Sequence, residues 1–148
     1  MDGRTARGVE LSARVRPHRT LQASIAYTFS DAPPPDGNGD GLPRAAAISA
    51  HQFSAHLQQR VGQLQVSFEL EAAGDHYVTL FDPVSFEARA YRFEGLVKAD
   101  LAATYTLSRG LAGVRVFGSL DNLFDRAYFV QGFRAPGRVG RGGLAVTF

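Results

Sequence analysis

Three oxygen-bearing residues at alternate positions, Asp36, Asn38 and Asp40, form the most conspicuous candidate ligand set in the sequence. They match the first half of a calcium-binding loop, D-x-[DN]-x-[DN]-G, in which carboxylate and amide oxygens bind the ion. The second half does not match, because the position that requires a bidentate acid is Ala47. We therefore favour a polar loop and keep loop calcium as a minor hypothesis.

Other reactive residues lack the spacing that chemistry requires. His51 and His56 are five residues apart, so a strand would place them on opposite faces. No serine lies in a G-x-S-x-G motif, and no nucleophile–base pair is visible. The glycine-rich segment 137–143 is followed by LAVTF, a strand-like stretch, whereas a phosphate loop precedes a helix. We expect neither enzymatic catalysis, nor a metal site, nor nucleic-acid binding.

The composition fits one folded domain of 148 residues with a formal charge of only +2, and it is rich in Phe (11) and Gly (16). Cysteine is absent, which excludes disulfides and thiolate metal sites. The sequence contains no apolar run of the length that a membrane-spanning helix needs. Its first residues also lack the apolar core of a signal peptide.

Polar and apolar residues alternate with the two-residue period of β-strands in seven segments. Their ranges are 8–16, 20–30, 53–58, 64–72, 93–107, 113–122 and 138–148. The connections are alternately short and long, and the long ones cover about 31–48, 73–90 and 123–137. Apolar residues in the second long segment suggest that strands extend into it.

The alternation of polar and apolar residues is typical of two architectures. One is a soluble barrel with an apolar interior, and the other is a membrane barrel with an apolar exterior. Strand length, the alternation of loop lengths and aromatic residues at strand ends favour the membrane barrel. The expected aromatic girdle comprises Tyr27, Phe29, Tyr91, Phe93, Tyr105 and Phe148. The prediction is an all-β, antiparallel, up-and-down transmembrane β-barrel segment of about seven strands, with short periplasmic turns and long extracellular loops.

The seven-strand count indicates part of a barrel, because single-chain bacterial barrels have even strand numbers and every edge must be paired in lipid. The expected interior carries charges at Glu94, Lys98, Asp100 and Arg115. These residues could line a water-filled lumen, contact a plug or pair with one another. The sequence alone does not decide between these roles.

The segment SLDNLFDRAYF, residues 119–129, resembles the NLFD…Y signature near the end of TonB-dependent outer-membrane receptors. The matching residues are Asn122, Leu123, Phe124, Asp125 and Tyr128. Residues 135–148 resemble the last strand of that family, which ends on Phe, and residues 8–32 are similar to an earlier hairpin.

This resemblance implies a 22-stranded barrel with an N-terminal plug that imports a ferric siderophore, haem or cobalamin with energy from the TonB complex. Residues 1–148 would form its C-terminal part, without the plug and earlier strands, and would not transport alone. Leu144, Val146 and Phe148 would form the signal read by the barrel-assembly machinery.

The resemblance also implies partners and a location. The partners would be outer-membrane lipid, the barrel-assembly machinery, the remaining strands and plug, the TonB complex and a metal-chelate ligand. The location would be the Gram-negative outer membrane with a periplasmic C-terminus. The alternatives are a small complete outer-membrane barrel and a soluble, lipocalin-like ligand-binding barrel.

Overall fold

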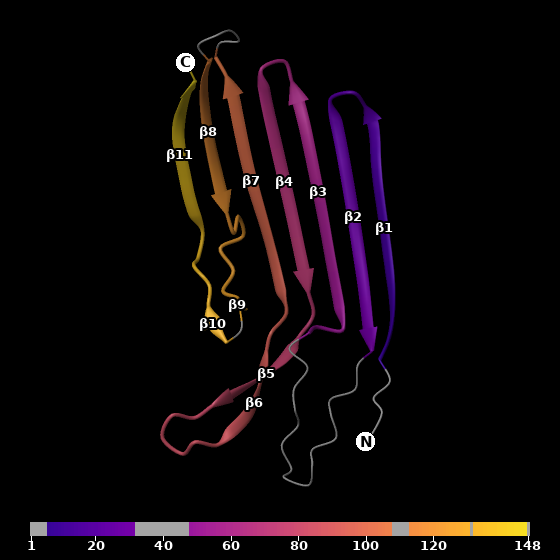
Figure 1. Cartoon of the computed structure of the whole chain (residues 1–148), viewed down its shortest axis with the longest axis vertical. Helices are drawn as coiled ribbons and strands as arrows, with labels where there is room; N and C mark the ends of the chain where they lie inside the picture. The colour runs from indigo at the N-terminus through magenta and orange to yellow at the C-terminus, as the bar shows by residue number, and fades with distance from the viewer. Residues whose placement is uncertain (1–5, 32–47, 108–112, 131, 148) are drawn as a thin grey trace.

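The computed structural model describes residues 6–31, 48–107, 113–130 and 132–147, and its main feature is one antiparallel sheet of seven strands (Figure 1). The strand order is β1-β2-β3-β4-β7-β8-β11. These strands are β1 (Arg7–His18), β2 (Leu21–Asp31), β3 (His51–Val61), β4 (Leu64–Ala73), β7 (Leu96–Thr106), β8 (Gly113–Asp121) and β11 (Val139–Thr147). The all-β, up-and-down prediction of seven long strands is confirmed.

Two small hairpins occupy the long connections beyond the lower end of the sheet in Figure 1. One consists of β5 (His76–Phe81) and β6 (Ala88–Phe93), and the other of β9 (Phe129–Val130) and β10 (Phe133–Arg134). The expected extension of strands into the second long segment is confirmed. The predicted continuous strand 93–107 is instead broken at Glu94 and Gly95, between β6 and β7.

Neighbouring strands pair apolar residues with apolar residues across the whole sheet. For example, Ile25 faces Ala55, which faces Leu70 on the next strand. The series continues through Ala99 on β7. We call the surface that carries these four residues the apolar face and the opposite surface of the sheet the polar face. A one-residue slip would exchange the two faces, so the observed register keeps them distinct.

The apolar face is largely uncovered. Among the described residues, Ala99 is the only fully buried hydrophobic residue, whereas Leu11 is 63% exposed and Leu144 is 70% exposed. Soluble monomers rarely expose a continuous apolar surface of this extent, and such surfaces mark contact with another apolar phase or partner.

The outer edges of the sheet are formed by β1 and β11, which no other described strand covers. Because all six pairings are antiparallel, β1 and β11 point in the same direction, as Figure 1 shows. They therefore cannot close the sheet by pairing with each other in the antiparallel manner. Within the described ranges no helix is long and apolar enough to cross a membrane.

Candidate functional site

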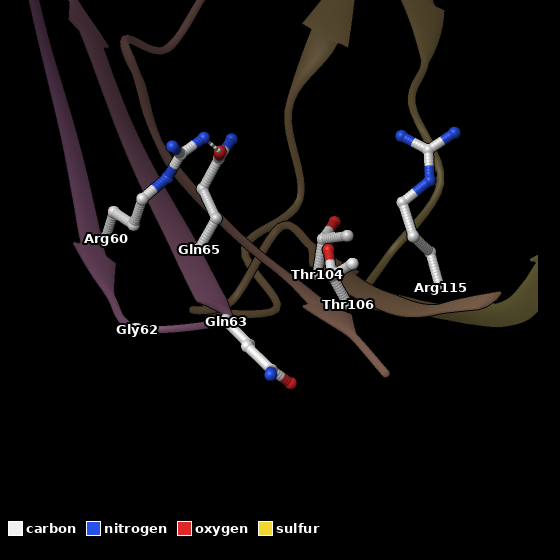
Figure 2. A pocket seen from close by; sticks show the side chains of 7 residues that line it. All are labelled: Arg60, Gly62, Gln63, Gln65, Thr104, Thr106 and Arg115. Carbon is white, nitrogen blue, oxygen red and sulfur yellow. Dashed lines mark hydrogen bonds between the residues drawn. The ribbon is translucent and has the colours of Figure 1, made fainter. Parts of the chain in front are cut away.

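The polar face is hollowed at the end where the short turns lie. A hollow of about 330 Å³ extends from β3 across β4 and β7 to β8 (Figure 2). Its lining consists of Arg60, Gly62, Gln63, Gln65, Thr104, Thr106 and Arg115. Every side chain in this lining is polar, and both charges are positive. The alternation placed Arg115 on the inner face, but Arg60 lay just outside the third predicted segment.

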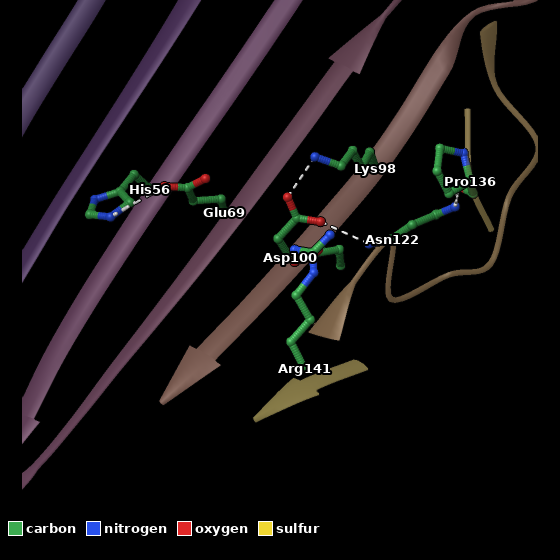
Figure 3. A network of polar contacts seen from close by, with 8 residues as sticks. His56, Glu69, Lys98, Asp100, Asn122, Pro136 and Arg141 are labelled. Atoms are coloured by element: carbon green, nitrogen blue, oxygen red, sulfur yellow. Dashed lines mark hydrogen bonds and ion pairs between the residues drawn. The ribbon is translucent and has the colours of Figure 1, made fainter. Parts of the chain in front are cut away.

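Charged residues form a second cluster nearer the middle of the polar face (Figure 3). Glu69 faces His56 on one neighbouring strand and Asp100 on the other. The His56 Nε2 atom lies 3.8 Å from Glu69 Oε1, and Lys98 Nζ donates a hydrogen bond of 2.6 Å to Asp100 Oδ2. Of the three roles considered for the inner charges, Lys98 and Asp100 therefore adopt pairing.

Asp100 also connects the sheet to the turn that follows β8. We call this segment, residues 122–128, the corner. Its second carboxylate oxygen, Oδ1, accepts a 2.8 Å hydrogen bond from the backbone N–H of Asn122. The next amide, that of Leu123, donates to the carbonyl of Ala99 at 2.7 Å. Two successive amides of the corner are thus held by two successive residues of β7.

The Asn122 side chain is 1% exposed and organises this corner. Its Nδ2 donates to the carbonyls of Arg126, at 2.9 Å, and Pro136, at 3.3 Å, while its Oδ1 accepts from the Arg126 amide at 3.2 Å. The φ of Asn122 is +53°, a left-handed conformation that Asn and Asp adopt more readily than other non-glycine residues. One side chain therefore ties the corner to the segment entering β11.

Asp125 makes the second tie to β11 and has the same φ of +53°. Its Oδ1 accepts a 2.7 Å hydrogen bond from the Arg138 amide. A Cβ on Gly137 would lie 2.8 Å from that oxygen, so a larger residue here would require the Asp125 carboxylate to shift. The described geometry gives Asn122 and Asp125 a structural role, while Phe124 stays 49% exposed. The last signature residue, Tyr128, accepts at its carbonyl from the Ala135 amide at 2.9 Å.

The two small hairpins contact each other beyond the sheet. The rings of Phe93 and Phe129 have centroids 5.2 Å apart, and a Cβ on Gly132 would lie 3.0 Å from Leu80. At the base of β5–β6, Arg92 pairs with Asp75, which also accepts a 2.8 Å hydrogen bond from the amide of Gly95 through Oδ1. No sequence pattern indicated this base, because its partners are 17 and 20 residues apart.

The proposed girdle residues lie in different settings. Tyr27 and Phe29 surround His51 at one end of β2 and β3; the Tyr27 hydroxyl is 2.8 Å from His51 Nδ1. Tyr105 faces Leu64 at the opposite, short-turn end. Tyr91 and Phe93 belong to β6, outside the main sheet.

The remaining predicted site residues lie partly beyond the described ranges. In the expected assembly signal, Leu144 and Val146 are 70% and 55% exposed on β11, and Phe148 lies outside the described residues. The hypothetical calcium ligands Asp36, Asn38 and Asp40 also lie outside them. Within the described ranges, no group of three or more His, Asp or Glu residues could hold a metal ion.

Comparison with known proteins identifies a similar fold. No family model matches the sequence. A solved structure of P. aeruginosa FpvA, a TonB-dependent receptor in complex with a heterologous pyoverdine and iron, matches 90% of this chain with a TM-score of 0.67 and 14% identity. The match spans 18% of the FpvA chain. At this identity the likeness establishes the fold of the seven-stranded sheet, which corresponds to a section of the larger FpvA structure.

Proposed function

We propose that residues 1–148 form the C-terminal barrel strands of a TonB-dependent outer-membrane receptor. The observation that carries the proposal is the exposed apolar face, continuous over all seven strands, opposite a charged polar face. Lipid covers such a face in a membrane barrel, where the polar face lines the interior. The FpvA-like fold and the NLFD…Y and terminal-strand resemblances support the same assignment.

The uncovered edges of β1 and β11 support a section of a larger barrel. In lipid an unpaired backbone N–H or C=O costs several kcal/mol, so each edge requires a partner strand. An antiparallel closure between β1 and β11 needs an odd number of additional strands, because these two edges run in the same direction. The resemblance to 22-stranded receptors, with fifteen further strands, meets this requirement.

The proposed activity of the whole receptor is uptake of a ferric siderophore or a similar metal chelate. FpvA is bound to a pyoverdine and iron in its structure, and we therefore take ferric siderophores as the proposed ligand class. In our proposal the end of the sheet with hairpins β5–β6 and β9–β10 faces the outside of the cell, where these hairpins would contact the ligand. We do not expect the seven strands alone to transport it.

The absence of cysteine permits a direct test, because a single introduced cysteine provides a unique labelling site. A bimane fluorophore would be attached at Leu101→Cys on the apolar face or at Ala102→Cys on the polar face, in protein reconstituted into vesicles. Quenchers attached to lipid chains should reduce the fluorescence at position 101 and not at position 102, whereas iodide in water should do the reverse.

The alternatives give different results. A soluble, lipocalin-like barrel would remain monomeric without detergent and show no lipid quenching at position 101. A small complete barrel would show the lipid quenching but would fold with protected edges in the absence of further strands. Amide exchange of β1 and β11 separates these cases, because unpaired edges exchange rapidly.

A further inference from the structure

The hollow at the short-turn end of the polar face has the chemistry of an anion-binding surface. Figure 2 shows Arg60 on β3 and Arg115 on β8, with Thr104 and Thr106 on β7 between them. The Arg60 guanidinium donates to Gln65 Oε1 at 3.4 Å. Guanidinium, hydroxyl and amide groups all donate hydrogen bonds, and guanidinium pairs with carboxylate in a two-bonded geometry.

Neither arginine has a carboxylate partner among the residues that the structure describes. The carboxylates of the polar face lie farther along the strands, and three of them have basic partners there. Asp100 pairs with Lys98, Asp121 with Arg141, and Glu69 lies near His56. Positive charge at the short-turn end therefore remains to be balanced from outside the described sheet.

The width of the hollow indicates the size of its ligand. Strands β3 and β8 are separated by three strand spacings, or about 14 Å. A single small anion contacts one guanidinium at this separation and leaves the other unpaired. An extended peptide rises about 3.3 Å per residue, so two acidic side chains four residues apart lie about 13 Å apart on the same side.

We propose that this hollow binds an extended acidic peptide segment whose carboxylates, four residues apart, pair with Arg60 and Arg115. Thr104, Thr106 and Gln65, which lie between the two arginines, hydrogen-bond the peptide backbone. A lipid headgroup does not fit this role, because its single phosphate would pair with one arginine and leave the other unpaired. Peptide binding here involves only the polar face, so it does not depend on the proposed receptor function.

The test is fluorescence anisotropy of labelled peptides titrated with the full chain in a neutral detergent. The probe is the peptide Gly-Ser-Glu-Ser-Gly-Ser-Glu-Ser-Gly, and its partner carries Gln at both Glu positions. We expect the acidic peptide to bind at low salt and the Gln peptide to bind at least about tenfold more weakly, because the Gln peptide lacks both charged pairs. Raising the salt from about 20 to about 300 mM should weaken the acidic peptide's binding, since screening acts on exposed charges.

Arg60→Gln and Arg115→Gln should each weaken binding of the acidic peptide about five- to tenfold, which is the effect of losing one charged hydrogen-bonded pair. Arg134→Gln removes the same charge from β10, outside the hollow, and should leave binding unchanged. Circular dichroism of each variant reports whether the sheet is formed. Arg60→Lys and Arg115→Lys retain the charge but lose the two-bonded geometry, so their affinity should lie between those of the unchanged protein and the Gln variants.

Several results would overturn the proposal. Equal binding of the acidic and Gln peptides, or an equal loss in Arg134→Gln, would show that the hollow does not select the carboxylates. Competition by inorganic phosphate at the same concentration as the peptide would show a site for one small anion. Because the quenching test of the membrane face is separate, failure here leaves the receptor proposal intact, and the reverse also holds.

Discussion

The carboxylate of Asp100 on β7 holds the backbone amide of Asn122, 22 residues later in the chain, at 2.8 Å. The same carboxylate takes a second hydrogen bond from Lys98, so both of its oxygens are used. Asn122 in turn binds the Pro136 carbonyl, just before β11. These contacts connect β7, the corner after β8 and the entry to β11 in one chain of hydrogen bonds.

Separate substitutions of Asn122 and Asp125, the two corner residues with positive φ, test this connection. Asn122→Asp keeps the shape but loses both Nδ2 donors and places carboxylate oxygen beside the carbonyls of Arg126 and Pro136. We expect a loss of about 3 kcal/mol in the free energy of unfolding, since buried polar groups lose their partners. Urea titration followed by circular dichroism measures it.

Asp125→Asn is the matched control. Its amide oxygen can still accept from the Arg138 amide, and Asn tolerates a φ of +53°. We expect a change within about 1 kcal/mol, because one acceptor replaces another. Equal effects of Asn122→Asp and Asp125→Asn would contradict a specific role for the buried Asn122 amide.

Gly95 is expected to be intolerant of any side chain. A Cβ at this position would clash with the Ala73 carbonyl oxygen, which is backbone and cannot rotate away. Gly95→Ala should therefore cost about 2 kcal/mol or more, as in other overpacked sites. The control is Gly118→Ala, where the nearest atom would be 3.5 Å away, and there we expect no loss. A similar stability for both variants, measured by urea titration, would rule out the close approach.

The sheet could be predicted from the sequence because its signal is local. Alternation in segments such as 64–72 indicates both the strand and its face. The corner could not be predicted in the same way, because the partners of Asn122 include Asp100 and Pro136, 22 and 14 residues away. The resemblance singled out Asn122 and Asp125 without stating what they do, and the structure supplies their contacts.

The break at Gly95 has a similar cause. The alternation from Phe93 to Leu107 has Leu96 and Ala102 as its only exceptions, so it predicts a single strand. The interruption comes from Asp75, whose carboxylate binds the Gly95 amide and Arg92 from another part of the chain. The basic hollow was missed for a further reason, because it requires the register of four strands. Alternation indicates which face each residue occupies, but a shift of two residues between strands leaves the faces unchanged, so alternation does not predict which residues lie side by side.

The base of hairpin β5–β6 should respond to acid. The hydrogen bond from the Arg92 guanidinium, followed by that from the Gly95 amide, lowers the pKa of Asp75 below its ordinary value of 3.8. A lowered pKa means that the ionised contacts stabilise the folded hairpin above about pH 4. This stabilisation is lost as the pH falls through the lower folded-state pKa.

Amide exchange of Gly95 measures this response. We expect protection to be constant from about pH 7 to about 4.5, after correction for intrinsic exchange, and to fall below that range. Asp75→Asn should abolish the fall. Asp82→Asn is the control, because the pKa of Asp82 is lowered by the Val84 and Ser85 amides at the tip of the hairpin, and this variant should retain the fall at Gly95. Protection that falls in Asp75→Asn as in the unchanged protein would contradict the assignment.

Two adjacent alanines of β7 provide the sharpest test of which face meets lipid. Ala103 faces Val66 and Gly118 on the apolar face, whereas Ala102 faces Ser67 and Ser119 on the polar face. Ala103→Arg should cost about 2–4 kcal/mol in vesicles if this position lies near the bilayer centre, because the charge enters hydrocarbon. Ala102→Arg adds the same side chain to the polar face and should change the stability by less than about 1 kcal/mol. Urea unfolding in vesicles compares the two variants directly, and a larger loss for Ala102→Arg would reverse the assignment of the faces.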